Sequence, residues 1–330
     1  MVRFLLATLL ACLFCGFAPA QKPNKNSEIL VPKTYQAPVI VTSAELQSIL
    51  TKAVEETIAA NAAKNVKAED VAATLIDLRD SAKFMMAEVR GESRIYSASV
   101  VKMYYMAALE RQLEDGKILM SRELQRGLRD MIVDSSNEAT QYILDVLTGT
   151  SSGAELPQKE FEAWQYKRNR VNRWFSAMGY TNINVNQKTF CEDAYGIEQQ
   201  SRGYKGQNRN MLTTNATARL LAEIVTGRMN TPVRTTSMMD LIKRDPFIKT
   251  PDGDNQATGF TGKLFIDRNI RNVKLWSKAG WTSKTRHDAA YIETADGLKF
   301  VLVIFTENHA NEREIIPGIA GKVLDGLRKK

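Results

Sequence analysis

Ser99 and Lys102 place a hydroxyl and an amine three residues apart, at the predicted start of an apolar helix. Residues at positions i and i+3 share one face of a helix, with about 5–6 Å between their Cβ atoms. A lysine at this spacing can take the serine's proton if burial or nearby positive charge lowers its pKa from about 10.4. The pair alone is a weak signal, because ordinary composition predicts about one such pair by chance in a chain of this length.

Two further polar motifs follow in the chain. Ser135-Ser136-Asn137 lies between two predicted helices, and Lys278-Ala279-Gly280 ends a predicted strand. Taken singly, the first suits a helix N-cap and the second suits a strand that ends in a turn. In order, however, serine-x-x-lysine, serine-x-asparagine and lysine-x-glycine form the signature of penicillin-interacting serine enzymes. The chain therefore resembles the class A β-lactamases and the related D-alanyl-D-alanine peptidases, over about residues 42–327.

The resemblance implies a role for each motif residue. Ser99 would be the acylated nucleophile, and Lys102 the base that accepts its proton. Lys278 would lower the pKa of Lys102 and attract a substrate carboxylate, and Ser135 would relay a proton to the leaving nitrogen. The other implied substrate-binding groups are the Asn137 amide and an oxyanion hole beside Gly280, made by the backbone N–H groups of Ser99 and Trp281.

The chain departs from the family pattern at three places. Ala279 stands where the third motif carries threonine or serine, and Ser136 stands where class A enzymes carry aspartate. The glutamate-x-x-leucine-asparagine motif, whose glutamate activates the deacylating water, is absent between Asn137 and Thr213. The acids in that region are Glu192, Asp193 and Glu198, of which Glu198 is the best placed, although its neighbours match the motif poorly. Without a positioned base, an acyl-enzyme would form but hydrolyse slowly.

The histidine content limits other hydrolase mechanisms. His287 and His309 are the two histidines of the chain, and no cysteine-rich cluster accompanies them. A zinc hydrolase needs more ligands at suitable spacing, so we expect neither a metal nor a cofactor. A serine–histidine–aspartate hydrolase would have to use one of these two residues. We expect His287 in a surface or structural position and His309 in a loop.

The first 20 residues are typical of a signal peptide. Arg3 precedes an apolar run over residues 4–17, and small residues mark a cleavage site near Ala20. We therefore expect an exported protein, periplasmic or secreted, with no transmembrane segment in the mature chain. Cleavage would leave Cys191 as the sole cysteine, so stability would have to come from a core and not from disulfides.

The formal net charge of the 330-residue chain is +8, and the basic residues are scattered. Export argues against a nucleic-acid partner, and a basic surface would favour anionic cell-wall polymers or simply solubility. The partner expected from the motifs is a small-molecule β-lactam or a peptidoglycan-type peptide. We expect the protein to be a monomer.

Strand patterns near both ends of the chain enclose a helical middle. This arrangement predicts an α/β (α+β) fold of the β-lactamase/transpeptidase-like type, an antiparallel sheet flanked by helices with an inserted helical subdomain. The predicted helices begin near residues 44, 99, 124, 139, 213 and 317, and the predicted strands cover residues 71–78, 83–89, 272–278, 288–293 and 299–305. Residues 149–212 are long, polar and weakly periodic, which indicates a functional loop region or an insertion.

These patterns give a division of the chain into a leader, an arm and one domain. Residues 1–20 are the signal peptide, and residues 21–41 are a tether or extended arm. Residues 42–330 form the hydrolase domain, with a sheet subdomain over about 42–96 plus 262–330 and a helical subdomain over about 97–261.

The functional prediction is an exported serine hydrolase that forms an acyl-enzyme at Ser99 with β-lactam or D-amino-acid peptide amides. Two alternatives stay open. One is a D-alanyl-D-alanine peptidase-type enzyme with slow deacylation, and the other is a catalytically reduced protein that binds cell-wall peptides. The departures at Ala279 and in the loop region motivate both.

Overall fold

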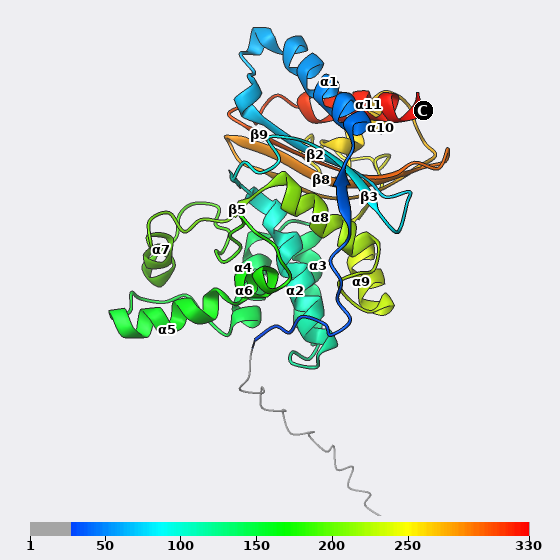
Figure 1. The fold of residues 1–330 in the computed structure, drawn as a ribbon. Coiled ribbons are helices and arrows are strands. Elements are labelled where there is room, and N and C mark those ends of the chain that lie inside the picture. Colours follow the sequence, from blue (N-terminus) through cyan, green and yellow to red (C-terminus); the bar gives the residue numbers. More distant parts are fainter. Residues whose placement is uncertain (1–27, 330) are drawn as a thin grey trace, which may run out of the picture.

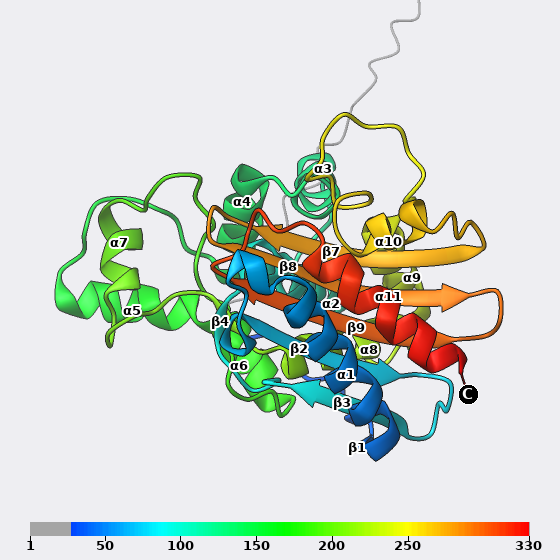
Figure 2. The same ribbon diagram turned by 90° about the horizontal axis from the view of Figure 1, so that it is seen from above.

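A seven-stranded sheet divides the molecule into two helical layers (Figures 1 and 2). This computed structural model describes residues 28–329, so the predicted signal peptide lies outside it. The strands of the sheet are β1 (Ile40–Thr42), β2 (Val71–Asp77), β3 (Phe84–Val89), β6 (Lys243–Arg244), β7 (Val273–Trp281), β8 (Thr285–Thr294) and β9 (Lys299–Glu307). Their order is β1-β3-β2-β9-β8-β7-β6.

Strand direction in the sheet agrees with the prediction at all but one pairing. The pair of β1 and β3 is parallel, and the other neighbouring pairs are antiparallel. A separate small sheet joins β4 (Ile95–Tyr96) to β5 (Met211–Leu212). The expected antiparallel sheet flanked by helices is thus confirmed, with a parallel strand added at one edge.

Side chains of the central strands alternate between two hydrophobic cores. On β9, Val301, Val303 and Phe305 enter one core, while Phe300 and Leu302 enter the other. This period of two follows from the pleat, which turns successive side chains to opposite faces. Both faces of the sheet are therefore buried, and both need a cover of helices.

One face is covered by helices from the two ends of the described chain. These are α1 (Ala44–Ala60), α10 (Thr261–Asp267) and α11 (Ile315–Arg328), which lie over the sheet in Figure 2. Ser43 caps α1, because its side chain accepts a hydrogen bond from the backbone N–H of Leu46.

The other face carries the helical middle of the chain. Its helices are α2 (Lys102–Glu114), α3 (Arg122–Ile132), α4 (Asn137–Thr148), α5 (Gln158–Arg168), α6 (Arg170–Ala177), α7 (Gly196–Arg202), α8 (Thr214–Val225) and α9 (Pro232–Ile242). Residues 102–113 of α2 are all buried, and the 3₁₀ turn η3 (Ala98–Val101) leads into it. The remaining 3₁₀ turns are η1 (Ala62–Lys64) and η2 (Ala68–Asp70). No helix in the described range is long and apolar enough to span a membrane.

Two regions differ from the sequence-based expectation. The segment 149–212 contains three helices, with α5 and α7 at the far end of the molecule in Figure 1. Strand β6 falls within the range expected for the helical subdomain, yet it pairs with β7 at the sheet edge.

Residues 28–39 form an arm that lies on the helical layer. The Tyr35 hydroxyl donates to the Glu223 carboxylate of α8 at 3.0 Å, and Glu28 pairs with Arg173 of α6 at 2.6 Å. The described part of the predicted tether or arm is therefore a docked arm.

Candidate active site

Ser99 lies in the second position of η3, at the mouth of a cleft. The residue before it, Ala98, has φ of 43°, a left-handed conformation that costs a non-glycine residue free energy. The turn η3 continues directly into α2, so residues 98–114 form one continuous helical segment. The expectation that the serine opens an apolar helix is met in this 3₁₀ form.

Lys102 is the first residue of α2 and is fully buried. Its Nζ donates to the Ser135 main-chain oxygen at 2.5 Å and to Asn137 Oδ1 at 2.9 Å, and it lies 3.4 Å from Ser135 Oγ. The first two motifs therefore meet at this amine.

The second motif divides its tasks among its three residues. Ser136 caps α4, since its hydroxyl accepts a hydrogen bond from the Ala139 N–H at 3.0 Å. Ser135, at φ of 56°, and Asn137 instead contact Lys102. The N-cap interpretation is thus correct for one residue, and its neighbours remain available to the cleft.

Lys278 reaches the same hydroxyl from the sheet. This side chain of β7 is fully buried, and its Nζ lies 3.0 Å from Ser135 Oγ. It also donates to the Ala279 main-chain oxygen at 2.7 Å and to Gln256 Oε1 at 2.6 Å. Two buried lysines therefore converge on Ser135.

Burial makes a full charge on both lysines unfavourable. Desolvation lowers the pKa of Lys102 to about 7, against a smaller opposing effect of Glu138. Desolvation also lowers the pKa of Lys278, and the positive charges of Lys102 and Arg244 lower it further. Near neutral pH the two lysines are therefore not both protonated to ammonium ions. The neutral amine of the pair can act as a base.

The third motif brings β7 against the backbone of η3. A Cβ on Gly280 would lie 2.8 Å from the Ser99 nitrogen and 2.9 Å from the Val100 nitrogen, so glycine is required for this approach. N–H groups in the first turn of a helix have no partner within the helix. Ser99 and Trp281, the strand residue after Gly280, both line the cleft.

The cleft has a volume of about 950 Å³. Its lining includes Ser99, Ser135 and Asn137 and three residues of β7, Ala279, Gly280 and Trp281. Phe190 and Cys191 of the 149–212 segment, together with residues 243–257, complete the wall. Cys191 Sγ accepts a 3.4 Å hydrogen bond from Asn137 Nδ2, so the segment closes on the second motif.

Glu198, the predicted deacylation base, is not among the residues that line this cleft. It is buried in α7, where both carboxylate oxygens bind Arg168, at 2.7 and 2.8 Å, and Lys188 Nζ lies 3.3 Å away. Burial acts to raise the pKa of Glu198, but Arg168 and then Lys188 outweigh it and hold that pKa below 4.5. A carboxylate paired in this way binds the segment together, and among the described residues no glutamate lines the cleft.

The histidines belong to the framework. His287 on β8 is buried, with its ring nitrogens against the Tyr96 oxygen and the Thr306 N–H, and burial lowers its pKa to about 4. His309, in the segment after β9, contacts Asp70 at 3.1 Å. No cluster of possible metal ligands occurs within residues 28–329.

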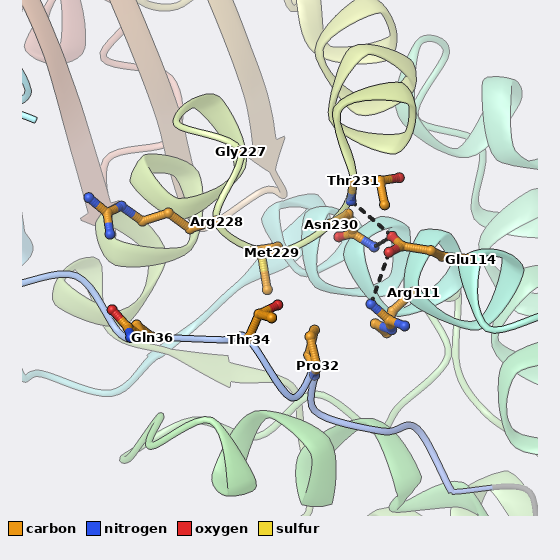
Figure 3. Close-up of a pocket in the computed structure, with 10 residues that line it drawn as sticks. All are labelled: Pro32, Thr34, Gln36, Arg111, Glu114, Gly227, Arg228, Met229, Asn230 and Thr231. Atoms are coloured by element: carbon orange, nitrogen blue, oxygen red, sulfur yellow. Dashed lines mark hydrogen bonds and ion pairs between the residues drawn. The ribbon is translucent and has the colours of Figure 1, made fainter.

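A second hollow, of about 330 Å³, lies beneath the arm (Figure 3). Its acidic and basic groups are already paired: Arg111 Nη1 donates to Glu114 at 3.2 Å, and Glu114 also accepts from Asn230 and the Thr231 N–H. This arrangement supports the arm and offers no serine–lysine pair.

Sequence reasoning missed two contributors to the cleft, Gln256 and Cys191. Cys191 was noted only as the sole cysteine left after cleavage, without a disulfide partner, and Gln256 lies in a loop without a motif. Their contacts join residues 22 or more positions apart, so no local pattern could have identified them.

A family model for the β-lactamase enzyme family matches residues 122–327. The match contains the second and third motifs and begins after Lys102. No curated protein sequence matches the chain.

Solved structures of similar fold cover most of the chain. A β-lactamase from Sphaerobacter thermophilus has a TM-score of 0.61 at 18% identity, covering 84% of this chain and 98% of its own. A β-lactamase from Xanthomonas campestris has a TM-score of 0.60 at 14% identity, covering 86% and 98%. PBP-A, and a variant of it in an acyl-enzyme complex with penicillin G, have TM-scores of 0.58 at 16% identity, covering 89% and 100%. At these identities the likeness concerns the fold.

Proposed function

Since the chain belongs to the β-lactamase enzyme family, we propose that it is an exported, monomeric serine hydrolase acylated at Ser99. Its substrates are β-lactams or D-amino-acid peptide amides. The observation that carries this proposal is the convergence of Lys102 and Lys278 on Ser135 Oγ, in a cleft that both Ser135 and Ser99 line. The penicillin G acyl-enzyme of the PBP-A variant supports the substrate class.

In the proposed reaction, Ser99 Oγ attacks the substrate's carbonyl carbon while Lys102 Nζ takes the hydroxyl proton. The N–H groups of Ser99 and Trp281 stabilise the negative charge that develops on the carbonyl oxygen. Collapse of the tetrahedral intermediate breaks the C–N bond, and the Ser135 hydroxyl gives its proton to the leaving nitrogen. Ser135 is then reprotonated from the lysine pair.

Release of the acyl group is the slow step of this proposal. The acids that line the cleft are Asp134, Asp245, Asp252 and Asp254, all on the loops around α3 and β6. Asp254 is paired with two arginines, and the loop beside Asn137 presents Cys191 in place of a carboxylate. The site therefore suits a penicillin-binding enzyme with a long-lived acyl-enzyme better than a fast β-lactamase.

Labelling with a fluorescent penicillin tests the proposal. The wild-type protein should become covalently labelled with one equivalent, and Ser99→Ala should remain unlabelled while keeping its melting temperature. Mass spectrometry of the labelled peptide should identify Ser99. Absence of labelling in both proteins would overturn the acylation proposal.

A catalytically reduced binding protein is the second candidate, favoured by the third motif's lack of a hydroxyl at Ala279. That candidate predicts binding of peptidoglycan fragments unchanged by Ser99→Ala, without turnover of a chromogenic cephalosporin. Measurable turnover by the wild-type protein would exclude it.

A further inference from the structure

Gln256 lies between the third motif and the end of α3, and no reaction step above uses it. Its Oε1 accepts hydrogen bonds from Lys278 Nζ at 2.6 Å and from the Ala279 N–H at 3.3 Å. Its Nε2 donates to the main-chain oxygens of Ile132 and Val133, at 3.1 and 2.8 Å. These four bonds use the full capacity of a carboxamide, so its orientation is fixed from both sides.

The acceptors around the two lysines differ in number. Lys278 Nζ has three at 2.6–3.0 Å, from Gln256, Ala279 and Ser135. Lys102 Nζ has two at 2.5–2.9 Å, and its third contact, to Ser135 Oγ, is 3.4 Å long. An ammonium needs three acceptors, whereas a neutral amine needs two and keeps a lone pair free. Because a positive charge on either amine lowers the pKa of the other, the two lysines compete for one proton. The number and length of the acceptor contacts favour Lys278 in this competition, and Gln256 is its closest acceptor.

We propose that Gln256 is a positioning residue of this site, whose carboxamide oxygen keeps the proton on Lys278 and leaves Lys102 as the unprotonated base. The inference rests on the acylation of Ser99 proposed above and adds a residue to it. A neutral acceptor is essential here, because a carboxylate at the same place would favour protonation of both lysines.

Other charged groups face the pair from several elements. Arg244 of β6 and Asp288 of β8 act on Lys278. Glu138 of α4 and Cys191 of the 149–212 segment act on Lys102. None of these four forms a hydrogen bond with either amine among the described residues. A charge introduced at position 256 would therefore act at the shortest range.

Gln256→Glu tests the inference through the pH profile of penicillin labelling. The acid limb of the profile should move upward by about one pH unit, because the added carboxylate stabilises the ammonium forms. Asn255→Asp is the matched control: it adds the same charge at the next residue, whose Oδ1 already accepts from the Ala257 N–H. An unmoved profile in Gln256→Glu, or an equal shift in the control, would overturn the inference.

A titration of the lysine side chains by NMR separates this inference from the proposed function. In ¹⁵N-lysine-labelled protein, the signal lost in Lys278→Met should titrate at higher pH in Gln256→Glu and at lower pH in Gln256→Met. Gln256→Met keeps the side-chain length, and it also serves if the glutamate variant fails to fold. Unlabelled wild-type protein would refute acylation alone, whereas an unshifted Lys278 titration would refute the role of Gln256 alone.

Discussion

Ser135 is the residue on which the geometry of the site depends most. It holds a left-handed backbone conformation, as does Ala98 next to Ser99. Such conformations cost about 1–3 kcal/mol and persist where the surrounding contacts determine them. Here those contacts are the two lysines at the side chain and main chain of Ser135 and the α4 cap at its neighbour Ser136. The left-handed backbone of Ser135 therefore directs its hydroxyl toward the amines of Lys102 and Lys278.

The pKa of Lys102 predicts how acylation depends on pH. Because burial lowers this pKa to about 7, the amine is protonated and inactive below that pH and free above it. The rate constant for penicillin labelling should therefore rise about tenfold per unit through the acid range and level off above pH 7. Lys102→Arg keeps a permanent positive charge and should slow labelling by about 10²–10⁴-fold at every pH. A flat profile in the wild-type protein would contradict the assignment of Lys102 as base.

Cys191 offers a test of the slow-release step. Its Sγ lies on Asn137, and it is exposed, so a longer side chain can be accommodated. A carboxylate here would approach the acyl group from the loop side and could activate water. Cys191→Glu should raise turnover of a chromogenic cephalosporin by about 10²-fold. Cys191→Gln has the same shape without a base and should stay at the wild-type rate; equal gains in both variants would exclude base catalysis as the cause.

At the scale of elements, apolar periodicity predicted the pieces that form the two cores. The long strands β2, β3, β7, β8 and β9 and the helices α1, α3, α4, α8 and α11 were all anticipated, because their apolar residues recur at periods of two or about 3.6. The helices α5, α6, α7, α9 and α10 were not. In α5 and α7 the buried residues include the polar Gln165, Arg168 and Glu198 beside Phe161 and Ile197, so no continuous apolar stripe marks these two helices.

The candidate site was predictable where its residues belong to sequence motifs, and not where they come from loops without a motif. The three motifs identified Ser99, Lys102, Ser135, Asn137 and Lys278, which the fold brings together. The contacts of Gln256 were beyond reach, because they link a loop to residues 22 and 124 positions away. Spacing along the chain also suggested Glu198 as a base, whereas its partner Arg168 lies 30 residues earlier and is fully buried.

The buried ion pair between Arg168 of α5 and Glu198 of α7 predicts that loss of this pair affects stability and not catalysis. Glu198→Gln removes a charge that Arg168 and Lys188 need, and should lower the free energy of unfolding by about 3 kcal/mol at neutral pH. Since Arg168 holds the pKa of Glu198 below 4.5, the wild-type advantage should shrink as pH falls through that lowered pKa. Urea denaturation at several pH values measures this. The acyl-enzyme lifetime at low temperature should match wild type; a longer lifetime would restore Glu198 as the base.

For the whole molecule, the docked arm ties the N-terminal part of the described chain to the helical layer. Arg219 Nη2 donates to the Tyr35 hydroxyl at 2.9 Å, and Arg219 Nε bonds to Glu223 at 2.8 Å. Glu223 is fully buried, and desolvation raises its pKa despite Arg219. The arm therefore supplies a hydrogen bond to a carboxylate that water does not reach.

Loss of that hydrogen bond should weaken the whole fold and leave the cleft intact. Tyr35→Phe should lower the free energy of unfolding by about 1–3 kcal/mol, because a buried charged acceptor loses a donor. The pKa of Glu223 should rise further in the variant, and a raised carboxyl pKa destabilises the folded state increasingly as pH rises. The penalty should accordingly be larger near pH 8 than near pH 5. Tyr195→Phe, at a residue 77% exposed, provides the control and should be neutral. Equal stability of both variants would show that the arm adds nothing to the fold, and a change in penicillin labelling would show that it reaches the active site.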